Sequence, residues 1–126
     1  MYGIYVRATS GIDYAKALVG GYKAYESRTR DVFKSLDLPQ EVAVIRTRSG
    51  HQPEIVGYIT LEPGFHVSRE EFRKLWAGHL VPPGSRFDSD DRGKWLYKAT
   101  SWRELATPQQ VPDHINHGRS FTEFVN

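Results

Sequence analysis

Alternating apolar and polar residues predict a chain built mainly from short β-strands. The runs "YGIYVRA" at 2–8 and "EVAVIRTR" at 41–48 alternate and are rich in residues that favour strands. A third run, "IVGYITLE" at 55–62, follows the short and breaker-rich segment "SGHQPE". This order predicts an antiparallel hairpin between 41–48 and 54–62. Gly57 inside the second strand indicates a β-bulge or a close approach of backbone.

Two short helices are expected from helical spacing and capping residues. Ser10 and Asp13 resemble a capping box before a first helix, which the glycine pair at 20–21 ends. Ser68 and Glu71 form a second capping box, opening a helix that runs through Trp76.

The second half of the chain is less regular. Breakers in "PPGSRFDSDDRG" at 82–93 predict a long exposed loop, and "KWLYKATS" at 94–101 predicts a strand. The segment "WREL" at 102–105 is a candidate short strand. Residues 106–126 are expected to be a mostly irregular extension that docks back on the body through its apolar residues, Phe121, Phe124 and Val125.

These elements predict one α+β domain spanning residues 1–126. About five or six short strands, mostly antiparallel, accompany two short helices. Without regular βαβ units, the strands favour a closed or nearly closed small sheet with the helices at its ends. There is no internal repeat and no linker.

Composition narrows the chemistry. The absence of cysteine excludes disulfides, thiolate zinc sites and cysteine nucleophiles. No apolar run is long enough to span a membrane and no signal peptide is recognisable, so we expect a cytoplasmic protein with no membrane partner. The net charge of +2 permits an anionic partner without requiring one, and aromatic residues at 13% either fill a core or stack on a ligand.

The segment "GGYKAYESRTR" at 20–30 carries the most distinctive polar pattern. A helix ends at the glycine pair, and a strand follows with the spacing G-x-K-x-x-E-x-R at Gly21, Lys23, Glu26 and Arg28. Glu26 and Arg28 are two residues apart, so they share a strand face and can touch. Lys23 has the opposite parity but sits beside the turn, from where it could lean over the same cleft.

This segment resembles the ASCH domain of the PUA-like superfamily, in which a strand and a short helix precede a Gly-x-Lys-x-x-Glu-x-Arg motif. The later strand pair, the helix of "SREEFRKLW" and the aromatic strand "KWLYKATS" are also similar, so that the resemblance covers roughly residues 2–105. It implies a small PUA-like β-barrel with a polar cleft beside the motif, and binding of RNA or nucleotides.

One branch of these domains consists of small amidohydrolases that remove the acyl group of N4-acetylcytidine with a Lys, a Thr and a Glu. Lys23 matches the lysine, but Glu26 stands where the Thr is expected, and "EEFRKLWAGH" offers no match for the catalytic Glu. A carboxylate beside Lys23 would hold its amine protonated, so we expect little or no hydrolysis of N4-acetylcytidine. Glu26 could nevertheless act as a general base on water.

Other basic and aromatic residues have two interpretations each. Arg46 and Arg48 share a strand face and either extend a basic rim around the motif or are ordinary exposed residues. Trp95 and Tyr97 either form a stacking platform for bases or fill the core, with Lys94 and Lys98 on the opposite, solvated face. The remaining tryptophans, Trp76 and Trp102, are expected in the core.

The histidines suggest little chemistry. His79, at the end of the second helix, either caps that helix or transfers protons near neutral pH. His114 and His117 have an i,i+3 spacing without a third ligand, so no metal site is predicted, and nothing indicates a cofactor.

The sequence therefore predicts an RNA- or nucleotide-binding module. Its cleft is formed by the motif residues Gly21, Lys23, Glu26 and Arg28, with Arg46, Arg48, Trp95 and Tyr97 as further ligand contacts. The alternative is a small hydrolase, an amidohydrolase or a ribonuclease-like enzyme, acting on a modified nucleoside or RNA through Lys23 and Glu26. A third alternative is a protein-interaction module whose cleft holds no small ligand.

Overall fold

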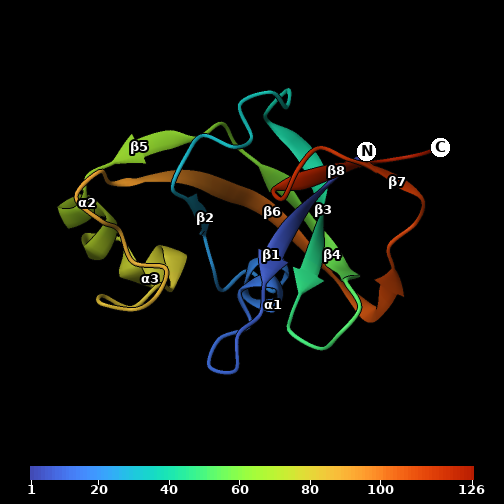
Figure 1. The fold of residues 1–126 in the computed structure, drawn as a ribbon, viewed down its shortest axis with the longest axis horizontal. Helices are drawn as coiled ribbons and strands as arrows, with labels where there is room; N and C mark the ends of the chain where they lie inside the picture. The colour runs from blue at the N-terminus through green and yellow to red at the C-terminus, as the bar shows by residue number, and fades with distance from the viewer.

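The computed structural model describes all 126 residues, which form eight strands and three short helices (Figure 1). In chain order they are β1 (Tyr2–Arg7), α1 (Tyr14–Val19), β2 (Tyr25–Arg28), β3 (Gln40–Thr47), β4 (Glu54–Leu61), β5 (Phe65–Val67), α2 (Arg69–Lys74), α3 (Trp76–His79), β6 (Lys94–Gln110), β7 (His114–Asn116) and β8 (Phe121–Phe124). None of the three helices has the length and apolar character needed to cross a bilayer.

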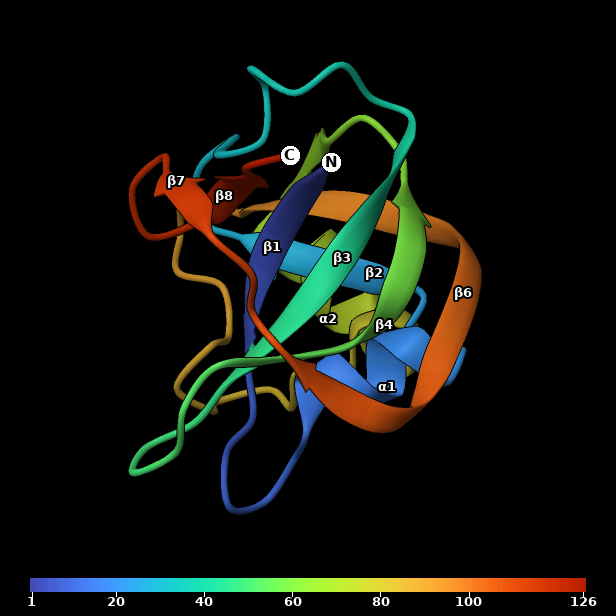
Figure 2. The same ribbon diagram turned by 90° about the vertical axis from the view of Figure 1, so that its right-hand side faces the viewer.

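The strands form one open, curved sheet with the order β2-β6-β4-β3-β1-β8-β7, and β5 pairs with β6 beside this path (Figure 2). β1 and β3 are parallel, and the other pairs are antiparallel. β7 does not pair back onto β2, so the expected closed barrel of five or six strands is wrong. The two end strands have only four and three residues, which leaves little backbone to close a ladder.

The predicted hairpin is confirmed. β3 pairs antiparallel with β4 from Gln40↔Leu61 to Arg46↔Glu54, and its register shifts next to Val44↔Gly57. A Cβ at Gly57 would lie 2.3 Å from the carbonyl oxygen of Arg103, so this glycine combines an irregular register with a close backbone approach.

β6 is the longest element and extends beyond the strand predicted at 94–101. Its first half pairs with β2 on one edge and β5 on the other, and its second half pairs with β4. Residues 106–126 are not mostly irregular, because they contain the end of β6 and all of β7 and β8. β8 pairs with β1, and Phe121 joins the hydrophobic core. This pairing joins the two ends of the chain, so no local pattern reveals it.

The helices start and stop at identifiable residues. Asp13, and not Ser10, caps α1: its Oδ1 accepts a hydrogen bond of 2.9 Å from the backbone N–H of Lys16. The predicted capping box of Ser68 and Glu71 is confirmed at α2. The helix expected to continue through Trp76 instead breaks at Leu75 and resumes as α3, which gives three helices in place of two.

The core lies between the sheet and the helices, and α1 packs on β3, β4 and β6. Phe72 of α2 is fully buried. Trp76 and Trp102 are not in the core: they are 50% and 54% exposed. Trp102 instead lies over the turn at Gly21, where its ring occupies the space that a Cβ would need.

Candidate functional site

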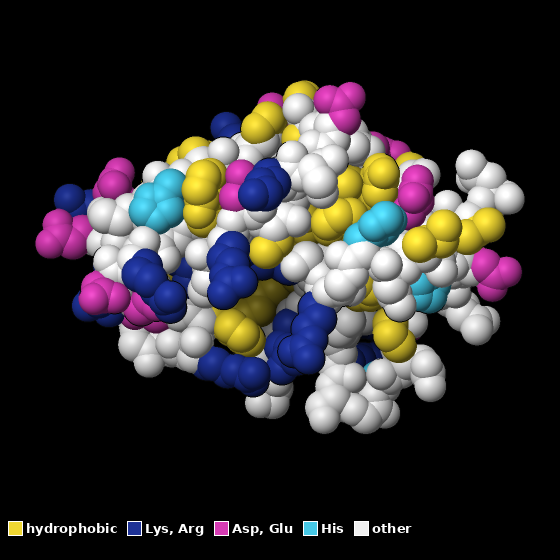
Figure 3. Space-filling view, turned by 45° about the horizontal axis from the view of Figure 1, so that its top comes forward, with side chains coloured by type: hydrophobic (Ala, Val, Ile, Leu, Met, Phe, Trp, Pro, Cys, Tyr) yellow, Lys and Arg dark blue, Asp and Glu magenta, His cyan; other side chains and the backbone are white.

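A polar cleft of about 320 Å³ opens beside β2. Residues of β1 and β2, the first residue of β6 and the segment that follows α3 form its walls. The lining residues are Tyr5, Val6, Arg7, Tyr14, Lys23, Glu26, Ser27, Arg28, Thr29, Thr47, Val81, Phe87, Lys94 and Arg119. Figure 3 shows a face of the molecule on which Lys and Arg side chains gather around a hollow.

The structure brings Lys23, Glu26 and Arg28 together in this cleft. Arg28 Nη2 donates to Glu26 Oε2 at 3.0 Å, as their shared strand face predicts. Lys23 Nζ lies 3.7 Å from Glu26 Oε1, so the carboxylate stands between an ammonium and a guanidinium. Glu26 Oε1 also accepts from the backbone N–H of Ser27 at 3.1 Å, and Arg28 donates to the carbonyl oxygen of Tyr5.

The turn after α1 sets the position of Lys23. Gly21 has φ +80°, in the left-handed region that favours glycine. The N–H groups of Tyr22 and Lys23 both donate to the carbonyl oxygen of Ala17, which ties the turn to the helix. Gly21 itself does not line the cleft, so its part in the motif is conformational.

Lys23 is almost completely buried. Its Nζ donates to the carbonyl oxygen of His79 and lies 5.1 Å from the centre of the Tyr14 ring. Burial lowers the pKa of Lys23 to about 8, with the charges of Arg28 and Lys94 acting in the same direction and Glu26 opposing them. Glu26 thus favours the protonated amine as expected, but burial outweighs it; at neutral pH the ammonium still predominates.

Three basic residues line the cleft without having been predicted there, and Lys94 is the most buried of them; the others are Arg7 and Arg119. Alternation in "KWLYKATS" placed it with Lys98 on a solvated face, but only Lys98 is exposed. Lys94 is 5% exposed, lines the cleft and has its Nζ 5.7 Å from the centre of the Phe72 ring. It makes no hydrogen bond or ion pair with the protein, and burial lowers its pKa. A lysine at a strand start gives no sequence signal for this environment.

His79 has a structural position. It is fully buried, and its Nδ1 accepts from the backbone N–H of Val81 at 3.0 Å. The other ring nitrogen, Nε2, therefore carries the proton and donates to the carbonyl oxygen of Phe72. Burial lowers the pKa of His79, so the ring is neutral at pH 7. His79 does not line the cleft. Its backbone carbonyl accepts the hydrogen bond from Lys23 Nζ and so helps to position that lysine.

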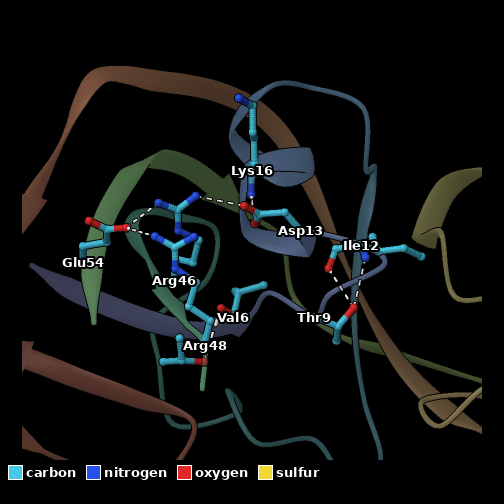
Figure 4. Close-up of polar contacts among 9 residues, drawn as sticks. Val6, Thr9, Ile12, Asp13, Lys16, Arg46, Arg48 and Glu54 are labelled. Atoms are coloured by element: carbon cyan, nitrogen blue, oxygen red, sulfur yellow. Dashed lines mark hydrogen bonds and ion pairs between the residues drawn. The ribbon is translucent and has the colours of Figure 1, made fainter. Parts of the chain in front are cut away.

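Arg46 and Arg48 lie outside the cleft. Arg46 contacts two carboxylates, Asp13 at 2.9 Å and Glu54 (Figure 4). Arg48 lies 3.4 Å from the same Glu54 and lines a second depression. That depression is bordered by Arg7, Ala8, Thr9, Ser10, Asp13, Thr47, Arg48, Ser49, His51 and Arg86; it shares Arg7 and Thr47 with the cleft.

Trp95 and Tyr97 do not form a stacking platform in the cleft. Tyr97 is fully buried, with its hydroxyl donating to Asp31 at 2.6 Å and its ring 4.8 Å from that of Phe33. Trp95 packs edge-on against His66. Both faces of β6 are covered at this point, so alternation could not identify an exposed side. The aromatic residues that do line the cleft are Tyr5, Tyr14 and Phe87.

His114 and His117 lie in and just after β7. His114 Nδ1 contacts the carbonyl oxygen of Pro112, and His117 stacks on Phe121 and lies 3.4 Å from Glu123. No group of three or more His, Asp or Glu side chains is arranged to hold a metal ion.

Comparison with known proteins gives one clear result, at the level of fold. No protein-family model matches the sequence, and no curated protein matches it either. Among solved structures, the ASCH protein from Zymomonas mobilis superimposes with a TM-score of 0.71 at 14% identity, covering 98% of this chain and 87% of that one. Two mutant structures of the same protein give TM-scores of 0.68 and 0.67 at 16% identity, and cover 88% and 90% of those chains.

The likeness spans nearly the whole of both chains, including the C-terminal strands that the sequence resemblance left out. It agrees with the similarity that the motif at 21–28 suggested. The protein therefore has the ASCH-domain fold, in a mostly β, α+β form with an open eight-stranded sheet.

Proposed function

We propose that this protein binds RNA or a nucleotide-like ligand in the cleft beside β2. The observation that carries the proposal is the charge of the lining. Five basic side chains and a single carboxylate surround the cavity; they are Arg7, Lys23, Arg28, Lys94 and Arg119, with Glu26 as the carboxylate. Such an excess of positive charge attracts anionic ligands, of which phosphate esters are the most common.

The size and the remaining lining fit a nucleotide. A cavity of about 320 Å³ is at the lower end of the range for small-ligand sites. Phe87 and Tyr14 provide an aromatic side against which a base can pack. Glu26 is an acceptor for an exocyclic amine, in keeping with the role that carboxylates have in base recognition.

A longer RNA could extend from the cleft onto a second basic surface. Arg7 and Thr47 border both the cleft and the second depression, where Arg48 and Arg86 add positive charge. The ASCH-domain fold adds support, since the resemblance of the motif to that family implies RNA or nucleotide binding. We assign Arg46 a structural role, because both of its carboxylate partners belong to the protein.

Fluorescence anisotropy with a short single-stranded RNA carrying a 3′ fluorophore tests the proposal. Affinity should fall steeply as salt rises, because phosphate contacts release counterions. Arg28→Gln should weaken binding, whereas Arg92→Gln should not, since Arg92 lies on the exposed loop and pairs with Asp90. No binding of RNA, DNA or nucleotides at low salt would reject the proposal in favour of a protein-interaction module.

A hydrolase acting on a modified nucleoside or RNA is the second candidate. One observation favours it: burial lowers the pKa of Lys23 to about 8, which makes some neutral amine available. Against it, Lys23 Nζ is held by the His79 carbonyl and by Glu26, a geometry that suits a fixed cation. Incubation with N4-acetylcytidine and with RNA should give no turnover, and turnover abolished by Glu26→Gln would make the hydrolase the leading function.

A further inference from the structure

We propose that the cleft recognises a phosphate monoester, the terminal phosphate of a nucleotide or of an RNA end, and that Lys94 is its main ligand. This inference rests on the proposed nucleotide binding and makes it more specific. It distinguishes a terminal phosphate from the internal phosphodiesters along a strand.

Three cations line the inner part of the cleft: Lys23, Arg28 and Lys94. The first argument is that Lys94 alone among them has no protein partner. Lys23 donates to the His79 carbonyl and Arg28 donates to Glu26, but Lys94 makes neither a hydrogen bond nor an ion pair. Its side chain is more than nine-tenths buried and lines the cavity. The lysine is largely withdrawn from water and its ammonium lacks a protein partner, which is costly, so an anion that enters the cleft would stabilise it.

The second argument is the charge of the inner cleft. Lys23, Arg28 and Lys94 with one carboxylate, Glu26, leave a surplus of two positive charges. A phosphodiester carries one negative charge, whereas a phosphate monoester carries about −1.5 to −2 at pH 7. The monoester therefore neutralises the inner cleft, and the diester does so only in part.

The third argument is the distribution of the lining. Lys94 and Lys23 belong to the charged part of the lining. Val81 and Phe87 form an apolar part of the same lining. A phosphate bound by Lys94 leaves room for an attached nucleoside to contact that apolar surface. Arg7 and Arg119 line the same cleft and are available to a second charged group of a longer ligand.

The test compares ligands that differ by one charge. Isothermal titration calorimetry at fixed salt would measure a nucleoside, its 5′- and 3′-monophosphates, the methyl ester of each monophosphate, and inorganic phosphate. The monophosphate should bind roughly tenfold or more tightly than its methyl ester, because only the monoester matches the surplus charge. This comparison uses the unaltered protein and so does not depend on any variant folding.

Variants then assign the effect to Lys94. Lys94→Met should reduce the preference for the monoester to about twofold or less while changing the affinity for the methyl ester much less. Lys98→Met, on the same strand but exposed, should leave the preference intact. Circular dichroism would confirm that both variants are folded.

RNA oligomers with and without a terminal phosphate complete the experiment. Stronger binding of a 5′- or a 3′-phosphorylated oligomer supports the inference and identifies the end. Equal affinity for monoester and methyl ester, or an unchanged preference in Lys94→Met, would overturn it while leaving RNA binding in place. If no nucleotide and no RNA binds at all, the proposed function itself fails.

Discussion

The imidazole of His79 lies parallel to the ring of Phe72, with 3.8 Å between the ring centroids and 4° between the planes. The same imidazole bridges two backbone groups, the carbonyl of Phe72 and the N–H of Val81. It thus joins α2, α3 and the segment that supplies Val81 and Phe87 to the cleft wall. His79 supports the site without contacting a ligand.

His79→Phe keeps an aromatic ring against Phe72 but leaves the Val81 N–H unpaired, and the Phe72 carbonyl keeps only its hydrogen bond from the N–H of Leu75. One unsatisfied buried group costs about 1–3 kcal/mol, so the variant should lose about 1–3 kcal/mol of unfolding free energy. Urea denaturation measures this loss. His114→Phe, at an exposed position, should change stability by less than about 0.5 kcal/mol, and an equally small effect at His79 would contradict the bridge.

Acid should destabilise the protein through the same residue. Burial lowers the pKa of His79 below its usual value of 6.5, so the unfolded state takes up this proton first as the pH falls. The stability that His79 contributes is complete above pH 6.5 and decreases as the pH drops towards the folded-state pKa. Unfolding followed from pH 7.5 to 5 should show this decrease in the natural sequence, and the decrease should be smaller in His79→Phe.

Nucleotide affinity should fall as the pH rises through 8. The pKa of Lys23 is lowered to about 8 and that of Lys94 is also lowered, so both lysines lose charge before ordinary surface lysines do. The other charged and titratable groups around Lys23 are Glu26, Arg28 and Tyr14. Burial and the charge of Glu26 both raise the pKa of Tyr14, so its hydroxyl stays neutral over this range. Anisotropy titrations between pH 7 and 9.5 should show the loss, and a flat profile would contradict it.

Gly21→Ala should be more destabilising than Gly50→Ala. Both glycines have positive φ values, +80° and +77°, so both substitutions strain the backbone by about 1 kcal/mol. Only at Gly21 would the new Cβ meet a side chain, 2.5 Å from the ring of Trp102, while Gly50 has open space. Thermal or urea unfolding measures the difference. Gly21→Ala with Trp102→Ala should recover part of the loss, and equal effects at the two glycines would argue against the contact.

Arg46 should contribute to stability and not to binding. Its side chain is 13% exposed, stands between Asp13 and Glu54, and connects the N-terminus of α1 to β3 and β4 (Figure 4). Arg46→Met should cost about 1–3 kcal/mol, because Asp13 loses its ion-pair partner and Glu54 keeps only the longer contact with Arg48. The control Arg48→Met removes a more exposed pair and should cost less than about 1 kcal/mol. A tenfold loss of RNA affinity in Arg46→Met with unchanged stability would reverse this assignment.

The sequence predicted the elements whose signals are local. The hairpin of β3 and β4 follows from alternation on both sides of a short connection, and Ser68 with Glu71 is sufficient to start α2. Glu26 and Arg28 touch because two residues on one strand face must be neighbours. In each case the partners lie within about twenty residues of each other, and backbone geometry alone determines the contact.

Features that depend on distant partners could not be predicted in this way. The open sheet depends on β8 pairing with β1, which brings together opposite ends of the chain. Tyr97 is buried where Phe33, from the segment between β2 and β3, packs against its ring, and Lys94 is buried where its Nζ lies 5.7 Å from the centre of the Phe72 ring of α2. Trp102 lies over the glycine turn at Gly21, which is about eighty residues away in sequence, and remains half exposed.

The pairing of β8 with β1 also has a consequence for synthesis on the ribosome. β1 is made first, and β3 can pair with one of its edges as soon as Gln40–Thr47 has emerged. The other edge must wait for Phe121–Phe124, so the nascent chain carries an open strand edge and an unfilled core position at Phe121 until that strand has emerged. Contacts of such long range are slow to form, and this domain therefore cannot complete its sheet before Phe121–Phe124 has left the ribosome.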